Sequence, residues 1–142
     1  MMKGLDLAEA YYKAHGAPMI GRQFGSYARR IAVGFVGPGS ECFGFDDEIS
    51  RDHDWGPAFC IWITAQDHKK VGKKIQAAYE NLPQSFKGFG PRRVSSGEEF
   101  RTGVCEIGLF YRNYTGLDHL PKSNQEWLYI PIAGLCLSLP VM

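Results

Sequence analysis

The stretch from Gly37 to Gly56 reads GPGSECFGFDDEISRDHDWG and lies between two apolar runs of the chain. Its glycine-rich start allows a ligand to approach the backbone, because glycine has no side chain in the way. Ser40 is a favoured N-cap, and a helix that begins there presents unpaired N–H groups to an anion. Asp52 and Asp54 alternate with His53, so in an extended chain both carboxylates point to one side. The pattern predicts a binding site for a metal ion that carries phosphate groups.

The apolar runs on both sides of this stretch have the composition of buried strands. Residues 31–36 are partly β-branched and lead directly into the glycine-rich turn. Residues 58–63 follow Gly56-Pro57, a pair that predicts a bulge or a sheet edge because proline cannot donate to a ladder. The expected order is therefore strand, short helix, strand.

Helical periodicity marks two longer segments. Gly4 to His15 carries apolar residues at helical spacing, and Gly16 predicts its end. Thr64-Ala-Gln-Asp67 resembles a capping box and opens a helix that runs to about Asn81. Four lysines of this helix are predicted to lie on one face, which is either solvated or in contact with a partner: Lys69, Lys70, Lys73 and Lys74.

A later apolar run, Gly103 to Phe110, is predicted to form a strand with Glu106 inside it. A carboxylate in that place must be exposed, paired or bound to a cation. Ser123-Asn-Gln-Glu126 reads as a second capping box before a short helix. Together these elements predict an α/β (α+β) fold, a mixed sheet flanked by helices, in one domain that covers residues 1–142.

Composition narrows the class of protein. The chain has 142 residues, of which 44% are apolar and 22% are charged, as in ordinary globular domains. A formal net charge of +1 gives no reason to expect general nucleic-acid binding or attraction to a membrane surface. No apolar run reaches the roughly 20 residues of a membrane helix. The start lacks the features of a secretory signal, so a cytoplasmic protein is expected.

Four cysteines, at positions 42, 60, 105 and 136, are scattered without any Cys-x-x-Cys spacing. Most lie in apolar stretches, where a free cysteine behaves as a small apolar side chain. Buried structural thiols are therefore expected in place of a disulfide framework or a zinc site.

In this order of elements, the chain resembles the nucleotidyltransferase superfamily, whose catalytic core is like that of DNA polymerase beta. The mark of that superfamily is a Gly-Ser pair followed after a short spacer by Asp-x-Asp. Here eleven residues separate Gly39-Ser40 from Asp52-His-Asp54. The wider block is similar to an uncharacterised bacterial family of nucleotidyltransferase-like domains, and the resemblance extends from about Leu5 to Trp127.

The resemblance implies a role for each matched residue. Gly39 and Ser40 would hold the β- and γ-phosphates of a nucleoside triphosphate. Asp52 and Asp54 would be catalytic ligands of Mg²⁺, which prefers oxygen ligands and keeps waters and phosphate oxygens. Glu106 would be the third carboxylate, which helps to activate the acceptor hydroxyl. The implied reaction is transfer of a nucleotidyl group to a hydroxyl acceptor, and the acceptor and the base preference stay open.

Two features depart from the superfamily pattern. Trp55-Gly56-Pro57 follows Asp-x-Asp directly, and the closer family carries a helical region after its core, so a shortened carboxyl end is expected. The apolar tail, residues 132–142, is expected to pack on this domain, on a protein partner or on a second copy of the chain. This tail motivates an alternative function, a non-catalytic module of the same fold that binds a protein partner.

Simpler interpretations of the motifs also exist. Gly39-Ser40 is compatible with an ordinary strand-to-helix turn that has a serine cap. Asp52-His-Asp54 is compatible with a surface turn held by its own side chains. A phosphohydrolase that uses the same carboxylates is a further alternative.

Overall fold

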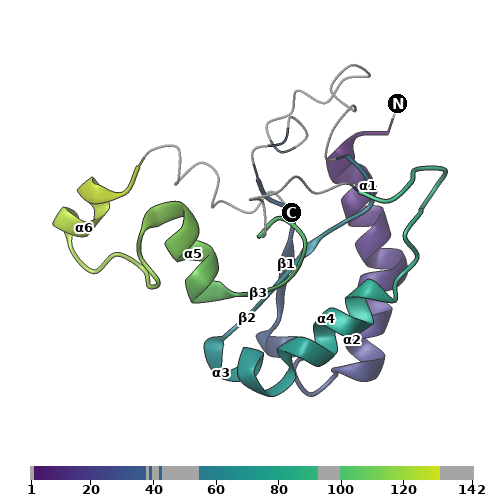
Figure 1. Cartoon of the computed structure of the whole chain (residues 1–142), viewed down its shortest axis with the longest axis horizontal. Coiled ribbons are helices and arrows are strands. Elements are labelled where there is room, and N and C mark those ends of the chain that lie inside the picture. Colours follow the sequence, from purple (N-terminus) through teal and green to yellow (C-terminus); the bar gives the residue numbers. More distant parts are fainter. Residues whose placement is uncertain (1, 38, 40–41, 43–54, 93–99, 132–142) are drawn as a thin grey trace.

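The computed structural model describes residues 2–37, 39, 42, 55–92 and 100–131 (Figure 1). Its three strands, β1 (Ala32–Gly34), β2 (Cys60–Ile63) and β3 (Gly103–Glu106), form one sheet in the order β1-β2-β3. β2 runs antiparallel to β1 and parallel to β3. The predicted mixed α/β architecture is thus confirmed, and its specific nucleotidyltransferase-like arrangement stays a prediction.

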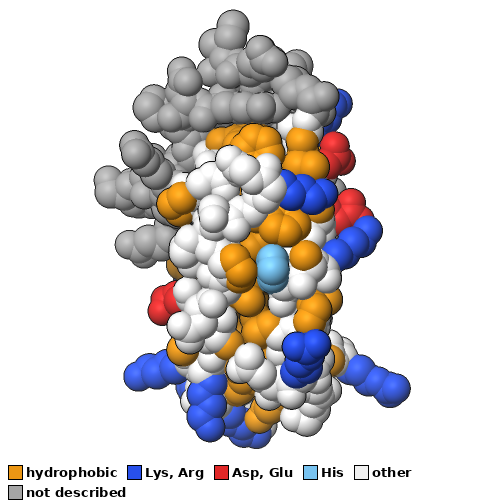
Figure 2. All heavy atoms as spheres, turned by 90° about the vertical axis from the view of Figure 1, so that its right-hand side faces the viewer, with side chains coloured by type: hydrophobic (Ala, Val, Ile, Leu, Met, Phe, Trp, Pro, Cys, Tyr) orange, Lys and Arg blue, Asp and Glu red, His pale blue; other side chains and the backbone are white. Residues whose placement is uncertain are grey.

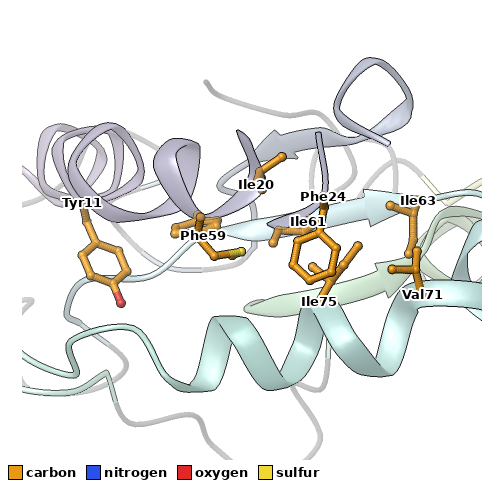
Figure 3. Packing of buried hydrophobic residues seen from close by; sticks show 9 residues of the cluster. Tyr11, Ile20, Phe24, Phe59, Ile61, Ile63, Val71 and Ile75 are labelled. Atoms are coloured by element: carbon orange, nitrogen blue, oxygen red, sulfur yellow. The ribbon is translucent and has the colours of Figure 1, made fainter. Parts of the chain in front are cut away.

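The central strand β2 is buried on both faces, which explains its uninterrupted apolar sequence. Ile61 and Ile63, with Phe59 just before the strand, belong to the core that lies between the first helical segment, the sheet and the helix after β2 (Figure 3). Cys60 and Trp62 alternate with them and pack on the opposite face. The cluster in Figure 3 consists of Tyr11, Met19, Ile20, Phe24, Phe59, Ile61, Ile63, Val71 and Ile75.

One helical segment at the start of the chain covers the first face of the sheet. It comprises α1 (Gly4–Tyr11), a π-helical turn (Tyr12–Gly16) and α2 (Ala17–Gln23), which follow one another without a break. The predicted end at Gly16 is therefore wrong. A Cβ atom on Gly16 would lie 2.5 Å from the Phe59 ring, so this glycine allows the helix to approach the core.

The helix predicted after Thr64 is confirmed. It comprises α3 (Ala65–Asp67), a π-helical turn (His68–Gly72) and α4 (Lys73–Glu80). The Asp67 N–H donates to Thr64 Oγ1 at 3.2 Å, as the capping box predicts. Its four lysines are exposed, and Figure 2 shows Lys and Arg side chains gathered towards the lower end of the molecule.

The opposite face of the sheet is covered by α5 (Ile107–Thr115), whose Phe110 ring lies 5.1 Å from Trp62. The predicted strand 103–110 is therefore wrong after Glu106, where the chain becomes helical. α6 (Asn124–Tyr129) begins as predicted, because Ser123 Oγ accepts the Glu126 N–H at 3.2 Å. None of the described helices is long and apolar enough to cross a membrane.

An ion pair ties the segment before β1 to the helix after β2. Arg30 donates through two nitrogens to the Asp67 carboxylate, at 2.8 and 3.1 Å. The Asp67 side chain is only 6% exposed, whereas that of Arg30 is 56% exposed. The Arg30 guanidinium also lies over the Tyr27 ring. Arg30 is thus the cationic partner of the buried Asp67 carboxylate among the described residues.

Arg30→Met is expected to lower the free energy of unfolding by about 2 kcal/mol, because it leaves a buried carboxylate without its cation. This value is below the roughly 3–5 kcal/mol of fully buried pairs, since water reaches Arg30 and screens the interaction. Denaturant unfolding measures the loss. Arg29→Met is the matched control, because Arg29 is exposed and its loss is expected to cost under about 0.5 kcal/mol. Equal losses in the two variants would contradict the prediction.

Candidate functional site at one end of the sheet

The three strands meet at an end of the sheet defined by Gly34, Cys60 and Gly103, which we call the entry end. Cys60 pairs with Gly34 in the antiparallel ladder and with Gly103 in the parallel ladder. The chain therefore leaves β1 towards Gly39 at this end, and it enters β2 from the side of Asp54 at the same end. The two halves of the sequence motif are attached to one end of the sheet.

The predicted site residues are only partly within the described chain. Gly39 is half-buried, and its carbonyl accepts the Cys42 N–H at 3.0 Å in a turn. Ser40, Asp52 and Asp54 lie outside the described residues, so their roles as phosphate and metal ligands stay predictions. Within the described part of the chain, no group of three or more His, Cys, Asp or Glu side chains could hold a metal ion.

Two arginines lie at the entry end, and sequence reasoning did not select either of them. Arg101 is 3% exposed, and a Cβ atom on Gly37 would lie 2.6 Å from its Nε. The guanidinium of Arg92 lies 4.8 Å from the centre of the Phe35 ring. Arg101 is distinguished by its burial two positions before β3. The spacing of residue types along the sequence does not reveal such burial. The entry end thus carries two arginine guanidinium groups, both of which interact with other parts of the protein.

A part-enclosed cavity of about 100 Å³ lies beside the same end of the sheet. Its walls come from the first helical segment, from the chain before β2, from the end of α4 and from the chain before β3. The lining residues are Tyr11, Pro57, Ala58, Tyr79, Gln84, Arg92 and Thr102. The cavity lies at the end of the sheet that the motif joins, and none of the described residues of the motif stretch lines it.

Glu106 lies at the opposite end of the β2–β3 pair. It pairs with Ile63, the last residue of β2, and it is the N-cap of α5. Its Oε1 accepts the Gly108 N–H at 2.7 Å, and its Oε2 accepts the Leu109 N–H at 3.1 Å. Its carboxylate thus caps the N-terminus of α5. The role of third catalytic carboxylate stays a prediction that this position disfavours.

Of the three described cysteines, Cys60 and Cys105 are the buried thiols that the sequence predicts, whereas Cys42 is half-buried. Cys60 Sγ donates to the Arg101 carbonyl at 2.9 Å, and burial raises the pKa of the Cys60 thiol. Burial also raises the pKa of Cys105 to about 11. Both thiols therefore stay protonated at neutral pH, which makes them poor nucleophiles and poor metal ligands.

A comparison with known proteins found no matching family model, no matching curated protein and no matching solved structure. The resemblance to nucleotidyltransferases therefore depends on the Gly-Ser and Asp-x-Asp pattern of the sequence.

Proposed function

We propose that the entry end of the sheet carries a metal-dependent nucleotidyl-transfer site. The reaction would move a nucleotidyl group from a nucleoside triphosphate to a hydroxyl acceptor. The observation that supports this most directly is the strand pairing, in which Gly34 faces Cys60. Because β1 and β2 are antiparallel, the turn that follows β1 and the carboxylates that precede β2 are joined to the sheet at the same end.

Each matched residue has a defined task in the proposed site. Gly39 and Ser40 hold the β- and γ-phosphates, since a turn with small residues lets backbone N–H groups reach an anion. Asp52 and Asp54 are the donor set for Mg²⁺, and carboxylate oxygens are the ligands this ion prefers. When bound, the ion neutralises phosphate charge and stabilises the attacking and leaving oxygens.

The described residues contribute positive charge and rigidity to the site. Arg101 is buried at the entry end and contributes a cationic guanidinium close to the turn that leads to Gly39. Its backbone carbonyl accepts the Cys60 thiol, which ties the chain before β3 to the start of β2. Glu106 lies at the other end of the β2–β3 pair. The proposed site therefore has Asp52 and Asp54 as its carboxylates and does not include Glu106.

Calorimetric titration with Mg²⁺ and each nucleoside triphosphate tests the proposal. We expect one or more triphosphates to bind in the presence of Mg²⁺. Asp52→Ala combined with Asp54→Ala is expected to weaken binding at least about a hundredfold, because even an outer-shell partner of a metal costs 10–100-fold in affinity.

The matched control is Asp6→Ala combined with Glu9→Ala, which removes two exposed carboxylates from α1. This control is expected to bind nucleotide like the unmodified chain. Absence of binding to every triphosphate, or equal affinity of the Asp52/Asp54 double variant, would refute the proposed site.

A second candidate function is the non-catalytic module that binds a protein partner, and the surface of α6 favours it. Four large apolar side chains in or just before this helix are between 51% and 85% exposed: Leu120, Trp127, Leu128 and Tyr129. Within this segment, His119 contacts Asp118 at 3.0 Å and Glu126 at 3.5 Å, which ties the chain before α6 to the helix. Exposed apolar patches commonly mark interfaces. Transfer of a labelled nucleotide to any acceptor by the purified chain would exclude this alternative.

A further inference from the structure

Lysine and arginine side chains gather at the end of the sheet opposite the entry end. β1 begins and β2 ends there, since Ala32 pairs with Trp62. Two segments meet at this end, residues 17–31 before β1 and residues 64–79 after β2, and the Arg30–Asp67 ion pair joins them. Figure 2 shows Lys and Arg side chains projecting from this lower end, where no Asp or Glu side chain is visible.

The charge of these two segments is concealed in the net charge of the chain. Together they contain seven Lys and Arg residues and one acidic residue, whereas the whole chain has a formal net charge of +1. Arg30 pairs with the acidic residue, Asp67. The other six cations are exposed and form no ion pair with another described residue. We call these six side chains the basic end: Arg22, Arg29, Lys69, Lys70, Lys73 and Lys74.

Four cations of the basic end lie along one helical segment. Lys69 and Lys73 are four residues apart, as are Lys70 and Lys74, so like charges are neighbours on successive turns. Like charges at this spacing destabilise a helix, and a bound anion would remove that cost. By contrast, Lys13 of the first helical segment has a carboxylate partner in Glu9. The basic end is therefore arranged to meet negative charge from outside the described chain.

The side chains around these cations distinguish between classes of partner. Interfaces between proteins are depleted in lysine and enriched in aromatic residues, whereas protein–DNA interfaces are much more positively charged. The large apolar side chains that are exposed in the described chain all lie between Leu109 and Tyr129, so the basic end has none to insert into a lipid surface. Its exposed neutral residues include Gln23, Ser26 and Gln66, and side chains of these types contact phosphate oxygens.

The same surface favours a duplex over a single strand. Proteins that bind single strands stack the bases on aromatic side chains. In residues 17–31 and 64–79 no aromatic side chain is exposed, and Tyr27 lies half-buried against the Arg30 guanidinium. A DNA duplex needs no such platform, and it carries one phosphate per roughly 1.7 Å of its axis. Several phosphates therefore come within reach of six cations at once.

We infer that the basic end binds the phosphate backbone of a double-stranded nucleic acid, independently of its base sequence. Four of the six cations are lysines, and lysine acts as a point charge without the fixed fork with which arginine makes bidentate contacts. Contacts of this kind position a protein on a duplex without reading bases. The inference goes beyond the proposed function and does not depend on it, because the basic end and the entry end are at opposite ends of the sheet.

Fluorescence anisotropy of the full chain with a labelled duplex tests the inference. The probes are a DNA duplex of about 20 base pairs and an RNA duplex of the same sequence, at salt concentrations from about 50 to 200 mM. We expect both duplexes to bind, with affinities within about tenfold of each other, because both present phosphates. The logarithm of the association constant should fall with the logarithm of salt concentration at a slope between about −3.6 and −5.4, the values for four to six phosphate contacts on DNA.

Lys69→Gln combined with Lys70→Gln, Lys73→Gln and Lys74→Gln removes four cations of the basic end. We expect this variant to bind the DNA duplex at least about a hundredfold more weakly at about 0.1 M salt, because four counter-ion-releasing contacts are lost. Its salt slope is expected to be smaller in magnitude by about 3.6. Lys70→Gln alone should reduce the magnitude of the slope by about 0.9, which tests the same contacts with a minimal change to the protein.

The matched control replaces four exposed lysines elsewhere in the chain by glutamine, and so changes the net charge equally: Lys3, Lys13, Lys87 and Lys122. We expect this control to keep the salt slope and to bind within about fivefold of the unmodified chain, since salt screens distant charges. Circular dichroism of both fourfold variants verifies that they are folded.

The inference is overturned if neither duplex binds, or if only one of them does, because phosphate recognition would then not explain the binding. It is also overturned if the fourfold variant of the basic end binds like the control, or if a single strand of the same length binds more tightly than the duplex. Vesicles that contain phosphatidylserine are the remaining probe. Tighter binding to these vesicles than to the duplex, at equal phosphate concentration, would make the basic end a membrane-binding surface.

Discussion

Phe59→Ala is expected to lower the free energy of unfolding by about 4 kcal/mol, the middle of the range for removal of a buried phenylalanine. Phe59 is fully buried, and its ring lies 5.3 Å from the Tyr12 ring and 5.0 Å from the Tyr79 ring. It also lies against Gly16, where the first helical segment comes closest to the sheet. The truncation would therefore open a cavity where three elements meet.

Denaturant unfolding followed by circular dichroism measures this loss, with the slope of the transition as a check on two-state behaviour. Tyr129→Ala is the control, because it also removes an aromatic ring but from a side chain that is 77% exposed. The control is expected to change stability by under about 0.5 kcal/mol. A loss for Phe59→Ala no larger than that of Tyr129→Ala would show that the ring is not a core residue.

Gly56→Ala is expected to lower the free energy of unfolding by about 3 kcal/mol, because the alanine would be strained in both backbone and packing. Gly56 has φ +149°, a conformation that residues with a Cβ rarely adopt. Its added methyl group would lie 2.9 Å from the backbone N and Cα of Arg92 and 3.0 Å from the carbonyl of Gly90. Backbone atoms cannot move aside as a flexible side chain can.

Gly21→Ala is the matched control for this substitution. Gly21 lies in α2, and a Cβ atom there would meet nothing within 4 Å. Alanine in an exposed helical position is favoured over glycine, so this variant is expected to gain about 0.5–1 kcal/mol. Thermal unfolding of the two variants should shift in opposite directions. A neutral Gly56→Ala would mean that the contact with the segment around Arg92 does not hold in solution.

The local signals in the sequence predicted local structure well. Thr64 and Ser123 cap the helices that follow them, and each accepts the N–H three residues later. A cap of this kind is formed by neighbours along the chain, so a short window of sequence contains all its partners. For the same reason, the apolar runs at 31–36 and 58–63 predicted the positions of β1 and β2, although both strands are shorter than the runs.

Two interpretations failed because the deciding partner is distant in sequence. Gly16 reads as a helix end, yet the helix continues through it, since the absent side chain makes room for the Phe59 ring. Glu106 reads as a carboxylate inside a strand, yet the strand ends there and the carboxylate caps α5. An apolar sequence around a charged residue suits a strand and a helix start equally well, and in the fold Glu106 begins a helix whose Phe110 ring packs on Trp62.

The sequence by itself determined the candidate chemistry: the Gly39-Ser40 turn, the Asp52-x-Asp54 pair and the apolar strands that flank them, because residue type and spacing carry that information. Only the tertiary structure decided which end of the sheet the motif joins and which residues accompany it there. Strand pairing brings Arg101 and the cavity of Tyr79, Gln84 and Thr102 to the entry end and places Glu106 at the other. The reason is physical, since the direction of a strand and its register are set by pairing across the sheet, to which residues far apart in the chain contribute.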